Sequence, residues 1–90
     1  MPDLWSGLLR LVRTGTDMTA RQLSTLHLCS LQAQTVRGLA ESMNIAKPAV
    51  SRAVDVLAER GYVERRDDPD DRRSVLVYLT KAGREFIATL

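Results

Sequence analysis

The stretch Val63–Gly83 reads VERRDDPDDRRSVLVYLTKAG and holds two short runs of strand-forming residues around a tight turn. In the second run, Val75, Val77 and Leu79 recur at every other position, which is typical of a strand with one face on a core. The turn is acidic, contains Pro69 and ends in two adjacent arginines. The stretch therefore predicts an antiparallel β-hairpin with arginines at its tip.

The segment before this hairpin predicts a helix. Asn44–Gly61 reads NIAKPAVSRAVDVLAERG, with apolar residues at positions 50, 53, 54 and 57, the spacing of one helical face. Pro48 suits a first helical turn, and Gly61 suits a left-handed stop at the C-terminal end. A helix followed at once by an arginine-tipped hairpin is the layout of a winged helix-turn-helix, which places one element in a DNA major groove and another over the neighbouring minor groove.

The remaining elements follow from apolar periodicity and capping residues. We expect a single domain in residues 1–90, mainly α-helical with a small antiparallel β-hairpin wing. A leading helix is expected within 1–15, with the apolar stripe Leu4, Trp5, Leu8, Leu11 and Val12. A second helix should run from the cap Thr19 to about Gln32, with Leu23, Leu26 and Leu31 inward, and a polar connector should follow over 32–35.

The rest of the domain is the DNA-binding part. We expect a helix-turn-helix over 36–60 and a wing over 62–79, with strands at 62–66 and 74–79. A closing helix over 81–90 should be capped by Thr80 and held by Phe86.

Composition limits the class of protein. Ninety residues, 44% of them hydrophobic, support one modest core. No run approaches the roughly 18 apolar residues of a membrane span, and the N-terminus lacks the pattern of a signal peptide. The single Cys29 excludes an internal disulfide and fits a reducing compartment. We expect a cytoplasmic protein without a membrane partner. Its net charge is only +2, so the placement of the arginines matters more than the total.

The helix over residues 47–60 offers a DNA-reading face. Its expected outward residues are Lys47, Ala49, Ser51, Arg52 and Asp55. Small residues let a helix approach a groove, Arg52 can reach O6 and N7 of guanine, and Ser51 can bind a phosphate or a base. An ordinary solvated face has the same pattern, so the helix alone does not decide between the two interpretations.

The hairpin favours DNA binding. Arg72 or Arg73 can place a guanidinium in a narrow, strongly negative minor groove. We expect Asp71, together with Asp67 or Asp68, to pair with one arginine and hold the other outward. A soluble, charge-balanced turn is the alternative interpretation.

From about Thr19 to Gly83 the chain resembles the MarR family of bacterial winged-helix transcription regulators. The resemblance is carried by TVRGLAESMNIAKPAVSRAVDVLAERGYVERR and DDPDDRRSVLVYLTKAG, and most specifically by the string DPxDRR…LTxxG. It implies a transcription factor, usually a repressor, that binds pseudo-palindromic double-stranded DNA as a homodimer. Carried onto matching positions, it implies DNA contacts by Lys47, Pro48, Ala49, Ser51, Arg52 and a wing arginine, Arg72 or Arg73, with Asp71 as the bracing acid.

The chain also departs from the family. Members usually carry long outer helices that form the dimer interface, and a small-molecule pocket lies between these helices and the DNA-binding part. This sequence offers one short leading helix and stops soon after the helix that follows the wing, so a small-molecule effector stays in doubt. Dimerisation could use Leu4, Trp5 and Leu8 together with Phe86, Ile87 and Leu90. A monomer and an excised fragment are the alternatives.

Other kinds of site find little support. His27 and Cys29 lie two residues apart on a helix, and the sequence has no second His or Cys to complete a zinc site. The acidic turn lacks the spacing of a calcium-binding EF-hand. No residue set combines a nucleophile, a base and an orienting group. We expect no metal, no cofactor and no enzymatic activity. The alternative function is a winged-helix protein-interaction module, in which the arginines would be incidental.

Overall fold

A computed structural model of the chain describes Leu9 and residues 18–89. Its elements are α2 (Ala20–Leu31), β1 (Gln34–Thr35), α3 (Val36–Met43), α4 (Lys47–Glu59), β2 (Val63–Asp68), β3 (Asp71–Leu79) and α5 (Lys81–Ala88). The stripe expected for a leading helix, and Leu90, lie outside the described residues. None of the described helices is long and apolar enough to cross a bilayer.

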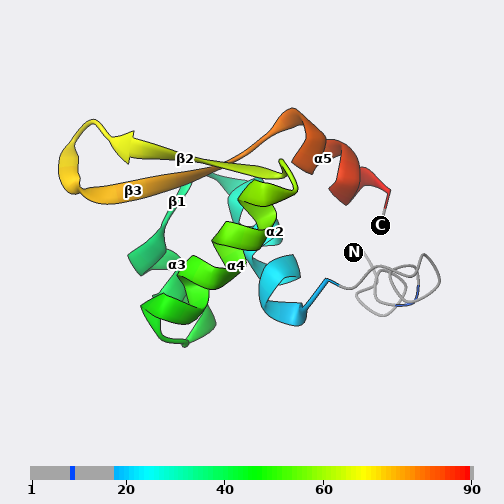
Figure 1. Ribbon diagram of the computed structural model, residues 1–90, viewed down its shortest axis with the longest axis horizontal. Coiled ribbons are helices and arrows are strands. Elements are labelled where there is room, and N and C mark those ends of the chain that lie inside the picture. Colours follow the sequence, from blue (N-terminus) through cyan, green and yellow to red (C-terminus); the bar gives the residue numbers. More distant parts are fainter. Residues whose placement is uncertain (1–8, 10–17, 90) are drawn as a thin grey trace.

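The helices form a body from which one long hairpin projects (Figure 1). The sheet is antiparallel with strand order β1-β3-β2. Strand β1 pairs Gln34 with Val77 and Thr35 with Leu76. Residues 32–35 were expected to be a connector throughout, and for 34–35 this was wrong. Two residues are too few to show an alternating pattern, so only their pairing with β3 makes them a strand.

Local capping residues set the helix ends as the sequence predicted. The Thr19 hydroxyl accepts a hydrogen bond from the Gln22 backbone N–H at 3.2 Å, and the Gln22 side chain accepts one from the Thr19 N–H at 3.0 Å. Thr80 caps α5 by accepting from the Gly83 N–H at 3.0 Å. Gly61, just beyond α4, has φ 79°, the left-handed conformation that glycine adopts without strain. These predictions are confirmed.

The core lies where α2, α3 and α4 meet the buried side of the sheet. Its buried members are Leu26, Cys29, Leu39, Ala40, Val50, Val54, Leu57, Val63 and Val77. The inward position of Leu26 is confirmed, whereas that of Leu31 was wrong, because Leu31 is 67% exposed. Leu31 follows Leu26 by five residues, which turns it about 140° around the helix, away from the core.

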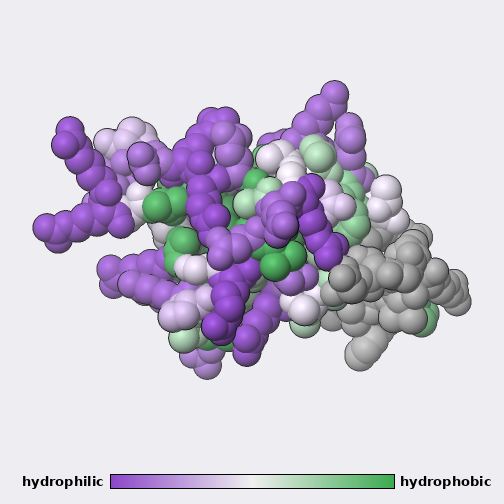
Figure 2. Space-filling model, viewed as in Figure 1, coloured by the Kyte–Doolittle hydropathy of each residue, from purple (hydrophilic) through white to green (hydrophobic). Residues whose placement is uncertain are grey.

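The wing is longer than the sequence suggested. Strands β2 and β3 run up to the two-residue turn Pro69-Asp70, so Arg72 and Arg73 belong to β3 and lie beside the turn. The expected ends of the strands at 66 and 74 were wrong, because pairing beyond them continues with Asp67 opposite Val75 and Asp68 opposite Asp71. Figure 2 shows hydrophilic side chains projecting from this end of the molecule.

Helix α5 packs against the segment between α4 and β2. The rings of Tyr62 and Phe86 stack with their centroids 4.7 Å apart, and Phe86 packs against the core as predicted. The Thr80 hydroxyl donates to the Gly61 carbonyl, and the Thr80 N–H donates to the Tyr62 carbonyl at 3.0 Å. Gly83 is buried against this same carbonyl. The LTxxG string therefore encodes both a helix cap and a close backbone approach.

Candidate nucleic-acid interface

Helices α3 and α4 pack against each other across the turn 44–46. Asn44 adopts the left-handed conformation at φ 54°, which ends α3, and Pro48 occupies the first turn of α4. With Val50, Val54 and Leu57 in the core, the opposite face of α4 is left to solvent. The exposed residues of this face are Lys47, Pro48, Arg52, Asp55 and Glu59, and Ser51 is half-buried at its edge.

The sequence placed Ala49 on the outward face, and this was wrong. Ala49 is 9% exposed and faces α2, beside Ala53. Two alanines on this flank let the two helices approach closely, so the small side chain serves helix packing. The structure thus leaves Lys47, Pro48, Ser51 and Arg52, but not Ala49, on the accessible side of α4.

Arg65 connects α4 to the wing. Arg65 of β2 donates from Nη2 to the Ser51 carbonyl at 3.3 Å and forms an ion pair with the Asp55 carboxylate. The pair compensates the negative charge of Asp55 on this face of α4. Sequence reasoning missed this role. The available signal was alternation in β2, because Arg65 shares the face of Val63 and therefore points toward α4.

The side chains of Arg72 and Arg73 emerge from an irregular part of β3. The strand register passes from Asp67 opposite Val75 to Asp68 opposite Asp71, so residues 72–74 are left over on β3 in the described register. Such a bulge bends a strand and changes the direction of its side chains. The two arginines are therefore presented by a bulge next to the turn.

Asp71 holds this bulge through the backbone. Its Oδ1 accepts from the Arg73 backbone N–H at 3.0 Å, and its Oδ2 accepts from the Ser74 hydroxyl at 3.1 Å. The predicted pairing of Asp71 with an arginine side chain was wrong, since the described residues show no ion pair between Asp71 and Arg72 or Arg73. The carboxylate lies closer to the local N–H and hydroxyl than to a flexible, solvated guanidinium. Asp68 acts similarly at the turn, accepting from the Asp70 N–H at 2.9 Å.

The other side of the ribbon carries a separate cluster. Arg66 lies over the Tyr78 ring, 5.0 Å from its centroid, and donates to Glu64 at 3.3 Å. The hydrogen bond to Glu64 raises the pKa of the Arg66 guanidinium above its ordinary value. Arg66 therefore covers the Tyr78 ring on this side of the ribbon and keeps its positive charge.

The exposed end of α4 and the wing turn lie toward the same side of the molecule, whereas α5 lies at the opposite end (Figure 1). The arrangement places a ribbon that presents Arg72 and Arg73 next to a helix face that carries Lys47 and Arg52. A surface of this kind suits a polyanion with two adjacent grooves.

His27 and Cys29, which the sequence did not support as metal ligands, lie in different surroundings. His27 is exposed on α2, whereas Cys29 is buried in the core. Burial raises the pKa of the Cys29 thiol to about 11, so the group is protonated at neutral pH and a poor nucleophile. The part of the chain that the structure describes holds no group of three or more His, Cys, Asp or Glu side chains suited to a metal ion.

Known proteins have a similar fold and related sequences. A model of the MarR family matches residues 16–74. The uncharacterized HTH-type transcriptional regulator YhbI of Bacillus subtilis is 43% identical over 49 residues, which cover 54% of this chain and 32% of YhbI. The multiple antibiotic resistance protein MarR of Escherichia coli is 37% identical over 70 residues, covering 74% of this chain and 47% of MarR. The crystal structure of the transcriptional regulator BldR from Sulfolobus solfataricus superposes with a TM-score of 0.80 at 30% identity, covering 88% of this chain and 56% of BldR.

The chain has the winged-helix fold of these regulators and belongs to the MarR family. It spans about half the length of the curated relatives it matches. The predicted fold class and family are thus confirmed. The elements described above correspond to the part that these proteins share.

The bridge between α4 and β2 leads to a prediction about stability. We expect the effects of Arg65→Gln and Asp55→Asn on the free energy of unfolding to be non-additive, because each substitution alone already removes the pair. The coupling energy should be only about 0.2–1 kcal/mol, because both partners are substantially exposed. Urea unfolding of the two single variants and the double variant measures this coupling. The Arg37–Glu41 pair on α3, more exposed at 77% and 69%, is the control and should couple more weakly. Full additivity at positions 55 and 65 would show that the bridge contributes nothing.

Proposed function

We propose that the protein is a transcription regulator that binds double-stranded DNA with sequence specificity. The observation that carries this proposal is the placement of an exposed α4 face, with Arg52, beside a wing whose bulge presents Arg72 and Arg73. A helix of this size fits a major groove, and an arginine on a projecting ribbon fits the minor groove next to it. The described relatives named as transcriptional regulators support the same function.

The proposed roles follow from position. Arg52 lies on the exposed face of α4 and would read a guanine edge, while Lys47 and Ser51 at the start of the helix would contact phosphates or neighbouring bases. Pro48 would lie against the backbone at the same end. One of Arg72 and Arg73 would enter the minor groove. Asp71 would act indirectly, by fixing the bulge from which these arginines extend.

We infer further that the protein acts as a homodimer in the cytoplasm and represses transcription. Its resemblance to the MarR family supports this assembly and this direction of regulation. A two-fold symmetric dimer would require two half-sites about one helical turn apart, roughly 10 bp. Of the described residues, Phe86 and Ile87 were expected at such an interface. Both side chains already pack against the core, so only their exposed portions are available to a second protomer. The proposal includes no effector and no catalytic role.

Selection from random duplexes, combined with sedimentation of the free protein and of its complex, tests the proposed function. Enrichment of an inverted repeat with half-sites about 10 bp apart, bound by two protomers, is the expected result. Weak association that does not depend on sequence, with no enriched motif, would instead favour a protein-interaction module.

The wing arginines lead to a prediction about salt dependence. We expect the double variant Arg72→Ala/Arg73→Ala to bind selected and random duplexes more weakly by similar factors, because minor-groove and phosphate contacts depend little on base identity. The slope of log affinity against log salt concentration should flatten by roughly one to two. Fluorescence anisotropy from 50 to 300 mM salt measures both effects.

The control for the wing variant is Glu64→Ala/Arg66→Ala, which alters the other cluster of the ribbon and leaves the net charge unchanged. It should keep the wild-type slope. An unchanged slope in the Arg72/Arg73 variant would remove the wing from the DNA interface.

A further inference from the structure

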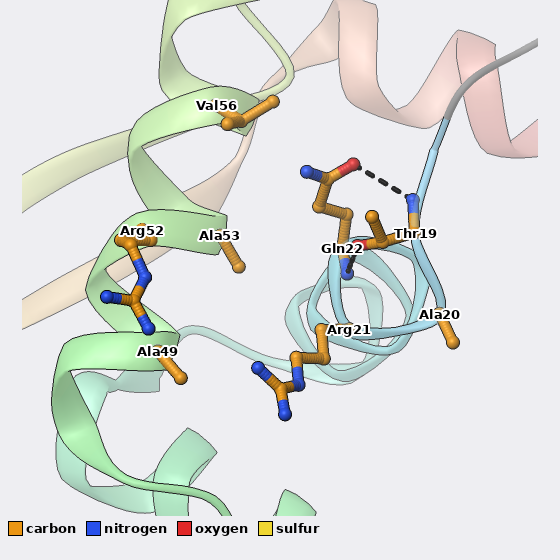
Figure 3. Close-up of a pocket in the computed structure, with 8 residues that line it drawn as sticks. All are labelled: Thr19, Ala20, Arg21, Gln22, Ala49, Arg52, Ala53 and Val56. Carbon is orange, nitrogen blue, oxygen red and sulfur yellow. Dashed lines mark hydrogen bonds between the residues drawn. The ribbon is translucent and has the colours of Figure 1, made fainter.

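A groove runs between the first turn of α2 and one side of α4 (Figure 3). Its volume is about 480 Å³, and its lining residues are Thr19, Ala20, Arg21, Gln22, Ala49, Arg52, Ala53 and Val56. The floor is made of small side chains, and the two long cationic side chains come from opposite walls, Arg21 from α2 and Arg52 from α4.

Among the residues that the structure describes, the two arginines of this groove have no acidic partner. Elsewhere in the described part of the chain, Arg37 pairs with Glu41, Arg65 with Asp55 and Arg66 with Glu64. By contrast, the described residues include no acidic side chain among those that line the groove, and none that pairs with Arg21 or Arg52. Two exposed guanidinium groups on one groove repel each other and favour an anion between or beside them.

The groove also adjoins the proposed DNA surface. Arg52 belongs both to the groove and to the exposed face of α4. A duplex that lies against this face therefore brings its sugar–phosphate backbone over the α2 side of the helix. The hydrogen bonds between Thr19 and Gln22 hold the first turn of α2, so the backbone that carries Arg21 is fixed before DNA arrives. A phosphate has the charge and the oxygen geometry that a guanidinium binds best.

We propose that Arg21 binds a backbone phosphate of the bound duplex at the mouth of this groove, next to the base pair that Arg52 reads. The inference rests on the proposed function and adds α2 as a further DNA-contacting element beyond α4 and the wing. The contact positions the recognition helix and carries no base specificity, because every nucleotide offers the same phosphate.

Substitution of Arg21 tests the proposal. Arg21→Ala should weaken binding to selected and random duplexes alike, by about five- to tenfold at 0.1 M salt, and should reduce the salt slope by about 0.9, the value for one lost phosphate contact. Arg21→Lys keeps the charge and should restore most of the slope. The control is Arg84→Ala, which removes the same charge from the exposed surface of α5 and should leave the slope at its wild-type value.

The possible results separate this proposal from the proposed function. Selective DNA binding with a wild-type slope in Arg21→Ala overturns the phosphate contact and leaves the function standing. Equal slope changes in Arg21→Ala and Arg84→Ala overturn it as well, since they would report only net charge. Failure of the wild-type protein to bind any duplex removes the function itself.

A second arm distinguishes a DNA phosphate from a free anion. The Nε–H signals of Arg21 and Arg52 are followed by NMR while the free protein is titrated with inorganic phosphate and, separately, with duplex. Shifts of the Arg21 signal with duplex, together with the changed slope of Arg21→Ala, support the proposal. A shift with inorganic phosphate alone, saturating at millimolar concentration, would assign the groove to a small anion and overturn it.

Discussion

Replacing Arg52 by alanine is expected to weaken binding to the selected operator by about 1–3 kcal/mol, which corresponds to about 5- to 150-fold, while random duplexes lose far less. The difference arises because a bidentate contact to guanine exists only where that guanine is present. Arg52 is exposed on α4, and the described residues offer it no ion-pair partner, so its donors are available to a ligand. Competition binding with operator variants at the contacted base pair measures the loss.

Arg52→Lys is the informative companion variant. It keeps the positive charge but cannot form the same two parallel hydrogen bonds, so it should retain affinity for random duplex and lose part of the discrimination. Arg84→Ala, on the exposed surface of α5, lowers the net charge by the same amount as Arg52→Ala and controls for that change. Equal losses on operator and random duplex in Arg52→Ala would contradict the base-reading role.

The second large effect concerns folding. Gly83→Ala should destabilise the protein by about 1–3 kcal/mol or more, because the added Cβ would lie 2.3 Å from the Tyr62 carbonyl oxygen and 2.7 Å from the Leu79 Cδ1 atom. The carbonyl belongs to the backbone and already accepts from the Thr80 N–H, so it cannot move without loss of that bond. Helix α5 has to shift outward instead.

Thermal unfolding measures this effect, and each kcal/mol should lower Tm by roughly 4–8 °C in a domain of this size. Glu85→Ala, an exposed substitution on the same helix, should stay within about 0.5 kcal/mol of wild type. A Gly83→Ala variant as stable as this control would mean that α5 does not approach Tyr62 as closely as described.

The sequence was a good guide wherever a feature depends on neighbours in the chain. Thr19 and Thr80 cap helices through residues three positions away, and Gly61 ends its segment through its own conformation. The amphipathic pattern of α4 likewise depends on residues within a few turns. Such signals need no knowledge of the rest of the fold, and the corresponding helix boundaries agree with the structure.

Features that depend on distant partners were missed. The short strand β1 exists only because β3 lies next to it, and Ala49 is covered only because α2 packs there. The contact of Arg65 with α4 joins residues that are 10 and 14 positions apart. Alternation from Val63 indicates that Arg65, and not Arg66, shares the inward face of β2, but only the packed fold shows that Ser51 and Asp55 lie within its reach.

For the candidate interface, the sequence pointed to individual residues, but it did not predict the contacts that these residues make. Asp71 was expected to pair with an arginine side chain, whereas its carboxylate accepts hydrogen bonds from the Arg73 N–H and the Ser74 hydroxyl. Arg21 went unnoticed because its neighbours in the sequence have no cationic pattern. It lies beside Arg52 only once two helices are packed.

The bridge from Arg65 to Ser51 and Asp55 has a consequence for the kind of operator that the protein can accept. The bridge favours one angle between the helix and the ribbon in the absence of DNA, and a change of that angle costs up to the roughly 0.2–1 kcal/mol that the exposed ion pair contributes. A duplex whose groove width or local twist differs from this preset angle would satisfy one element and strain the other. Base pairs that no side chain touches would then influence affinity through the stiffness of the DNA, and substituting Arg65 would broaden the range of tolerated shapes.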